Sequence, residues 1–67
     1  MTLIELWERK GLSPTAVAAQ AGISPTTLYK MARKEHVARR TIVRVCEVLG
    51  ISRQDYEALD ADKVQNS

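Results

Sequence analysis

One three-residue pattern, glycine followed by an aliphatic residue and serine, occurs three times and divides the chain. The three copies are Gly11-Leu12-Ser13, Gly22-Ile23-Ser24 and Gly50-Ile51-Ser52. Glycine can adopt the left-handed conformation that ends a helix, the aliphatic side chain can pack over that end, and serine can cap the next helix. The pattern therefore predicts four helical blocks separated by short turns.

The block between Ser24 and Gly50 is too long for one helix with this pattern, and residues 34–38 interrupt its apolar spacing. A fifth helix follows from that interruption. At the two ends of the chain, the pairs Thr2/Glu5 and Ser52/Asp55 have the spacing of capping boxes. The expected helices span about residues 3–10, 14–21, 25–33, 41–49 and 53–59.

The apolar residues of these helices recur at helical spacing and predict one core. We therefore expect an all-α, compact five-helix domain over residues 1–59, followed by a polar, flexible tail at residues 60–67. The chain has 67 residues, so this core is small and its stability margin is low. The predicted core positions are Leu3, Leu6, Trp7, Val17, Leu28, Met31, Ile42, Val45, Cys46, Leu49, Tyr56 and Leu59.

The net charge of +2 conceals a strong segregation of charge along the chain. The segment 30–44 holds six lysines and arginines against one glutamate, whereas the segment 45–67 holds five carboxylates against two cations. A basic middle beside an acidic end can orient a protein on a polyanion.

Several classes of protein are disfavoured by the composition. The single cysteine, Cys46, allows no internal disulfide or zinc cluster, and its core position predicts an inert buried thiol. The carboxylates are scattered, and no glycine-rich phosphate loop is present, so an enzyme is not expected. No metal, cofactor or small-molecule ligand is indicated. Because the sequence shows neither a long apolar run nor a signal peptide, we expect a cytoplasmic protein with no membrane partner.

The segment 13–33 contains two short helices joined by a tight turn. Ser13-Pro14 and Ser24-Pro25 each place a hydroxyl at the N-cap and proline in the first turn. On the second helix, one face carries hydroxyls and cations, which are groups that contact base edges and phosphates. Tyr29 belongs to this face but can instead pack against the loop at residues 34–37. The residues of the face are Thr26, Tyr29, Lys30 and Arg33.

Arg39 and Arg40 lie at the expected start of the fourth helix, where the helix dipole disfavours positive charge. A phosphate at that end would reverse the sign of the interaction, because the free N–H groups and both guanidinium groups can bind it. Solvated arginines are the alternative. His36, in the preceding loop, has no second ligand nearby and is expected to meet solvent or phosphate.

Residues 11–59 resemble the phage-repressor-type helix-turn-helix family, Cro/cI-like or XRE. The matching residues are Val17-Ala18, Ala21-Gly22-Ile23-Ser24, Thr27-Leu28, Met31, Thr41-Ile42 and Leu49-Gly50-Ile51. The resemblance implies a lambda-repressor-like domain whose second and third helices form the helix-turn-helix, with the third helix in the major groove. It implies base reading by Pro25, Thr26, Tyr29 and Lys30, and phosphate contact by Thr15, Arg33, Lys34, His36, Arg39 and Arg40.

The chain departs from the family pattern at four positions. Pro14 and Pro25 replace the polar residues that often begin the second and third helices, so Pro25 offers only an apolar contact. Ala32 and Lys34 replace the usual glutamate and glycine after the third helix. Lys34 thereby adds positive charge toward the DNA backbone.

The first functional hypothesis is a sequence-specific transcriptional repressor or regulator, bacterial or phage-encoded. Its partner would be double-stranded DNA carrying an inverted repeat, bound by a homodimer. The dimer surface would be formed by Val43 and Val48 or by the fifth helix. Two alternatives stay open at this point: a protein-interaction module such as an antitoxin or antirepressor, and an architectural factor that bends DNA during recombination.

Overall fold

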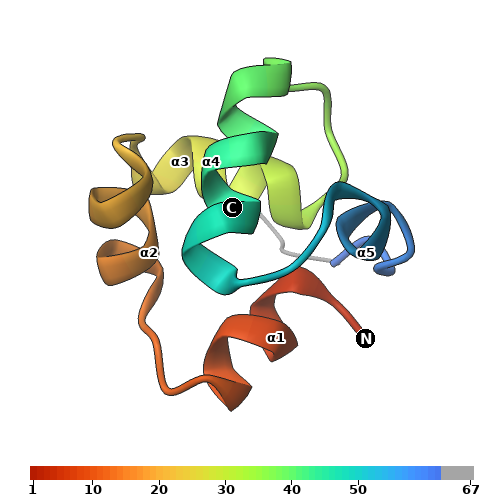
Figure 1. Ribbon diagram of the computed structural model, residues 1–67, viewed down its shortest axis with the longest axis horizontal. Helices are drawn as coiled ribbons and strands as arrows, with labels where there is room; N and C mark the ends of the chain where they lie inside the picture. The colour runs from red at the N-terminus through yellow and green to blue at the C-terminus, as the bar shows by residue number, and fades with distance from the viewer. Residues whose placement is uncertain (63–67) are drawn as a thin grey trace.

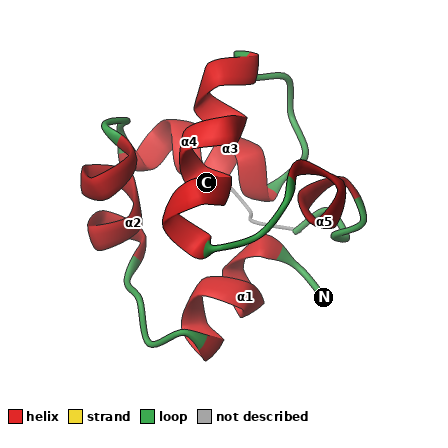
Figure 2. Ribbon diagram, in the orientation of Figure 1, coloured by secondary structure: helices red, strands yellow, loops and turns green. Residues whose placement is uncertain are grey.

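The computed structural model describes residues 1–62, which fold into five helices joined by short loops (Figures 1 and 2). Within this range no residue lies in a named strand, and one isolated bridge pairs Thr2 with Asp60. The prediction of a compact, all-α, five-helix domain is confirmed. The helices are α1 Leu3–Arg9, α2 Pro14–Ala21, α3 Pro25–Ala32, α4 Arg39–Leu49 and α5 Arg53–Glu57.

The three glycine turns have the conformation that the sequence predicts. Gly11, Gly22 and Gly50 have φ angles of 72°, 72° and 69°, in the left-handed region. At each turn the amide of the following aliphatic residue donates to the carbonyl five residues earlier, at 2.9 to 3.0 Å. This bond satisfies a carbonyl that the helix end would otherwise leave open.

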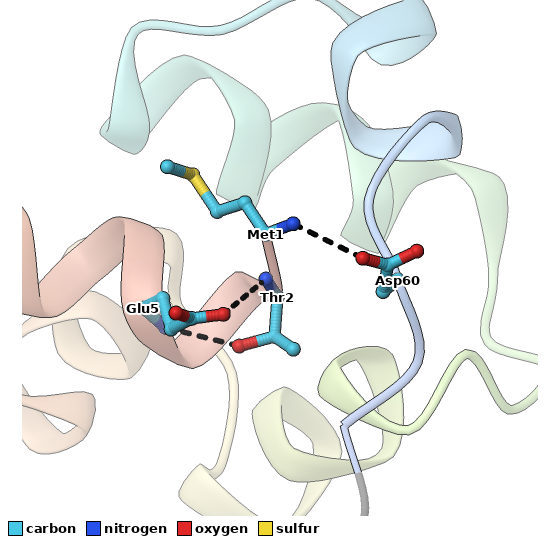
Figure 3. Close-up of polar contacts among 4 residues, drawn as sticks. All are labelled: Met1, Thr2, Glu5 and Asp60. Atoms are coloured by element: carbon cyan, nitrogen blue, oxygen red, sulfur yellow. Dashed lines mark hydrogen bonds and ion pairs between the residues drawn. The ribbon is translucent and has the colours of Figure 1, made fainter.

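The predicted caps also form. Ser13, Ser24 and Ser52 each accept a hydrogen bond from the amide three residues later. In the capping box of α1, the Thr2 amide donates to Glu5 at 2.9 Å, and the Glu5 amide donates to the Thr2 hydroxyl at 3.2 Å (Figure 3). The bond from the Thr2 amide holds the pKa of Glu5 below its usual value. The starts of α1, α2, α3 and α5 are therefore encoded locally.

The helices enclose a single core. Trp7, Leu28, Met31 and Val45 are each at most 2% exposed, and the thiol of Cys46 is buried as predicted. Burial raises the pKa of that thiol, and the charge of Asp55 adds to the shift. Three predicted core residues pack only partly against this centre; they are Leu6, Ile42 and Leu59.

Two helix boundaries differ from the predicted positions by two residues, and the ends of α1 and α3 differ by one. Helix α4 begins at Arg39, two residues before the expected Thr41. The apolar spacing gave no sign of this first turn, because Arg39 and Arg40 are exposed arginines. Helix α5 ends at Glu57, and the predicted core residue Leu59 lies beyond it.

The first residues of the predicted flexible tail have fixed partners. The Asp60 amide donates to the Met1 carbonyl at 2.8 Å, and the Asp60 carboxylate accepts from the N-terminal ammonium at 3.0 Å (Figure 3). The Asp62 amide donates to the carbonyl of Ala32, at the end of α3, at 2.7 Å. Asp60 and Asp62 are thus bonded to Met1 and to the end of α3. The rest, residues 63–67, lies outside the described range.

Candidate nucleic-acid interface

Helix α3 has one buried face and one exposed face. Leu28, Met31 and Ala32 are completely covered and fix the orientation of the helix against the core. Pro25, Thr26 and Lys30 are exposed on the other side. Of the four residues of the predicted polar face, Thr26 and Lys30 are exposed, whereas Tyr29 and Arg33 are partly buried.

The first turn of α3 is held by its own cap. The Ser24 hydroxyl accepts from the Thr27 amide at 3.2 Å and lies 3.0 Å from the Thr27 hydroxyl. Thr27 is thereby engaged within the cap, whereas the neighbouring Thr26 is exposed. Pro25 occupies the first helical position, where no intrahelical amide bond is lost.

Tyr29 is half-buried, which reduces its share of the exposed face. Its ring packs edge-on against Trp7 of α1, with the ring centroids 6.0 Å apart and the planes at 78°. This geometry is favourable for an aromatic pair. The tyrosine therefore joins α3 to α1, and only part of its side chain can belong to a reading surface.

Arg33 caps the end of α3 and is paired within its own loop. Its Nε donates to the Glu35 carboxylate, and only 16% of the arginine side chain is exposed. This hydrogen bond is the main reason that the pKa of Glu35 lies below its usual value. The guanidinium of Arg33 is therefore partly compensated and partly covered, unlike a free surface cation.

Lys34 occupies a different place from the one predicted. Its Nζ donates to the main-chain carbonyl of Tyr56 at 2.7 Å and lies 4.0 Å from the centre of the Tyr56 ring. The head group is thus held against α5 by a charge-assisted hydrogen bond and a cation–π contact. The charge of Lys34 therefore has partners within the protein.

The start of α4 lacks a side-chain cap. Ala38 is the N-cap residue and has no oxygen that can accept from the first-turn amides. Arg39 and Arg40 follow it as the first two helical residues, and both are exposed. Open amides and two guanidinium groups at one helix end form a favourable environment for a phosphate.

The other predicted phosphate contacts are also accessible. Thr15 is exposed in the first turn of α2, and His36 is exposed in the loop between α3 and α4. Helix α2 packs against both α3 and α4, so the three elements that carry these residues form one unit. In Figure 1 the loop after α3 passes along one side of the molecule to the start of α4.

Sequence reasoning missed two groups that bear on α3. The Tyr56 hydroxyl donates to the Met31 carbonyl at 3.1 Å, and the Asp62 amide donates to the Ala32 carbonyl. Tyr56 was recognised only as an apolar core residue, and nothing local to Asp62 indicates its partner. Both contacts depend on tertiary proximity between residues far apart in sequence.

A groove of about 270 Å³ lies between the end of α2 and the middle of α4. The Arg44 guanidinium reaches across it, so that a Cβ added to Gly22 would lie 3.2 Å from one of its nitrogens. The groove lining combines small residues with opposite charges. The lining residues are Ala19, Gln20, Ala21, Gly22, Arg44, Glu47 and Val48.

Residues 1–62 contain no group of three or more histidine, cysteine and acidic side chains placed to hold a metal ion. None of the helices in the same range has the length and apolar character that a membrane span requires.

Two short helices joined by a glycine turn, with a polar and cationic face on the second, define the helix-turn-helix class of DNA-binding domains. Comparison with known families agrees, because residues 2–59 match the family described as a helix-turn-helix domain. The chain belongs to that family, and this membership supports DNA binding. No curated protein and no solved structure gave a significant match.

Proposed function

We propose that this protein is a sequence-specific regulator, in the simplest case a transcriptional repressor, of the phage-repressor type (Cro/cI-like, XRE). The exposed face of α3 would enter the major groove of duplex DNA. One observation carries the proposal: the α2–α3 pair buries Leu28 and Met31 and leaves Thr26 and Lys30 exposed on a rigidly capped helix. A helix fixed in this way can present hydrogen-bonding groups to base edges.

The proposed base contacts are those of the exposed first turns of α3. Thr26 would donate or accept a hydrogen bond, Lys30 would donate one, and Pro25 would contact a thymine methyl group. Tyr29 would contribute only the part of its side chain that Trp7 leaves free. The proposed phosphate contacts are Thr15, His36, Arg39 and Arg40, with a smaller share for Arg33; Lys34 is omitted because α5 holds its head group.

We further propose that two copies bind an inverted repeat in the cytoplasm, with no catalytic step. The α2–α4 groove supports this assembly, because Arg44 and Glu47 carry opposite charges beside the partly exposed Val48. In a two-fold contact Arg44 of each copy can meet Glu47 of the other copy. Val43, which is 41% exposed, lies on the same helix and adds apolar surface.

Substitution of the reading residues tests the proposal. On duplex DNA selected by the wild-type protein, Thr26→Ala and Lys30→Ala are each expected to reduce the preference over random duplex about tenfold, because a lost base contact is worth roughly 1–3 kcal/mol of discrimination. Competition binding followed by fluorescence anisotropy measures this ratio.

Thr15→Ala is the matched control, since loss of a phosphate contact weakens all sequences alike. Unchanged preference in both Thr26→Ala and Lys30→Ala would refute the assignment of α3 as the reading helix. Absence of duplex binding by the wild-type protein would instead favour a protein-interaction module.

A further inference from the structure

The end of α3 is unusual among the helix ends of this domain. Lys34 has a φ angle of 62°, in the left-handed region, and is the one non-glycine residue among 1–62 with a positive φ. The Lys34 amide donates to the Met31 carbonyl and the Glu35 amide donates to the Lys30 carbonyl, both at 2.9 Å. The three glycine turns have the same pattern of hydrogen bonds. An L-residue is strained in this conformation, so other contacts of Lys34 must offset the cost.

One such contact is the attachment to α5. The Lys34 Nζ binds the Tyr56 carbonyl at 2.7 Å and lies over the Tyr56 ring, while the Tyr56 hydroxyl returns to the Met31 carbonyl at 3.1 Å. The two residues therefore form a closed loop of contacts between α3 and α5. We call this pair, Lys34 and Tyr56, the α3–α5 clasp.

The clasp is part of a complete set of bonds to the last turn of α3. The four carbonyls from Tyr29 to Ala32 would have no partner within the helix. Each of them accepts a hydrogen bond from outside the helix, and two of the donors, Tyr56 and Asp62, come from the C-terminal part of the chain. The end of α3 is thus fixed by residues outside the helix-turn-helix.

We propose that Lys34 and Tyr56 are positioning residues for DNA binding: they hold the end of α3, and with it Lys30, in the orientation that contacts DNA. This inference rests on the proposed function of α3. It differs from the family-based expectation, in which residue 34 contacts phosphate. The charge of Lys34 is used inside the protein, so its loss acts on the geometry of α3.

Tyr56→Phe is the sharpest test, because it removes the bond to Met31 and changes no charge. Lys34→Met removes the head group but keeps most of the side-chain volume, and Lys34→Arg retains a donor and a charge. Arg40→Met is the matched control for loss of a cation at a proposed phosphate contact. All affinities are measured on one duplex across a salt series, at a temperature where every variant is folded.

We expect Tyr56→Phe and Lys34→Met each to weaken binding about three- to tenfold at every salt concentration, with the wild-type dependence of log K on log salt. Lys34→Arg should retain most of the wild-type affinity. Arg40→Met should instead reduce the slope by about one, as expected for one phosphate contact. A slope reduced equally by Lys34→Met would overturn the proposal, as would unchanged affinity in both clasp variants.

Hydrogen exchange of the free protein gives a readout that does not involve DNA. The amides of Arg33, Lys34 and Glu35 should exchange at least tenfold faster in Tyr56→Phe and Lys34→Met, because their bonds to α3 carbonyls open more often. Unchanged exchange would overturn the clasp itself. Faster exchange in a protein that binds no duplex would sustain the clasp but refute its role in DNA binding, together with the proposed function.

Discussion

Replacement of both Arg39 and Arg40 by alanine is expected to weaken duplex binding roughly sixtyfold at 0.1 M salt, with the loss shrinking toward zero near 1 M. Each phosphate contact contributes about −0.9 to the slope of log K against log salt. Loss of two contacts therefore makes the slope less steep by about 1.8, which is roughly sixtyfold over the tenfold range from 0.1 to 1 M salt. Both arginines are exposed at a helix start that has no side-chain cap, so they are free to reach a phosphate.

The same double substitution is expected to raise the free energy of unfolding slightly. Positive charge at a helix N-terminus opposes the helix dipole by about 0.3–1 kcal/mol per charge. Urea denaturation should therefore show Arg39→Ala/Arg40→Ala to be at least as stable as the wild type. Opposite effects on affinity and stability distinguish phosphate-binding arginines from structural ones.

Arg53→Ala is the control for simple loss of charge, because Arg53 lies on α5 and outside the basic segment 30–44. Its effect on the salt slope should be small. A double variant at Arg39 and Arg40 that keeps the wild-type slope would show that the start of α4 does not touch the DNA backbone.

Leu28→Ala is expected to unfold the domain or bring it close to unfolding. Leu28 is completely buried at the centre of α3, and truncation of a buried leucine costs about 2–5 kcal/mol. A core of this size rarely supplies more than about 3–5 kcal/mol in total. The substitution therefore removes most of the stability, and DNA binding is lost with the fold.

Thermal unfolding followed by circular dichroism measures this effect. Glu8→Ala is the control, since substitution of an exposed helix residue outside the proposed contacts should change the free energy of unfolding by less than about 0.5 kcal/mol. A loss below about 1 kcal/mol for Leu28→Ala would contradict the central position assigned to this residue.

The helices were predictable because their boundaries are encoded locally. The glycine turns and serine caps each depend on residues within one turn of the boundary, and every one of them forms. The start of α4 was left open between Arg39 and Thr41, because Ala38 gives no capping signal and Arg39 and Arg40 carry no apolar pattern. Local patterns thus determined this fold almost completely.

The candidate site was less predictable, because its polar side chains have tertiary partners. The family resemblance implied that Lys34 contacts the DNA backbone, yet its head group binds the Tyr56 carbonyl, 22 residues away. Tyr29 has the spacing of the exposed face, yet its ring packs on Trp7. The exposed residues without such partners, Thr26 and Lys30, lie where the helical period placed them.

The central claim is that α3 reads duplex DNA, and selection of bound duplexes from a random pool tests it most directly. The account predicts an enriched motif made of two half-sites related by two-fold symmetry, with centres about one DNA turn, roughly 34 Å, apart. Enrichment of a single half-site would refute the proposed dimer alone. A bound population with the same sequence content as the input pool would contradict the claim that α3 reads bases.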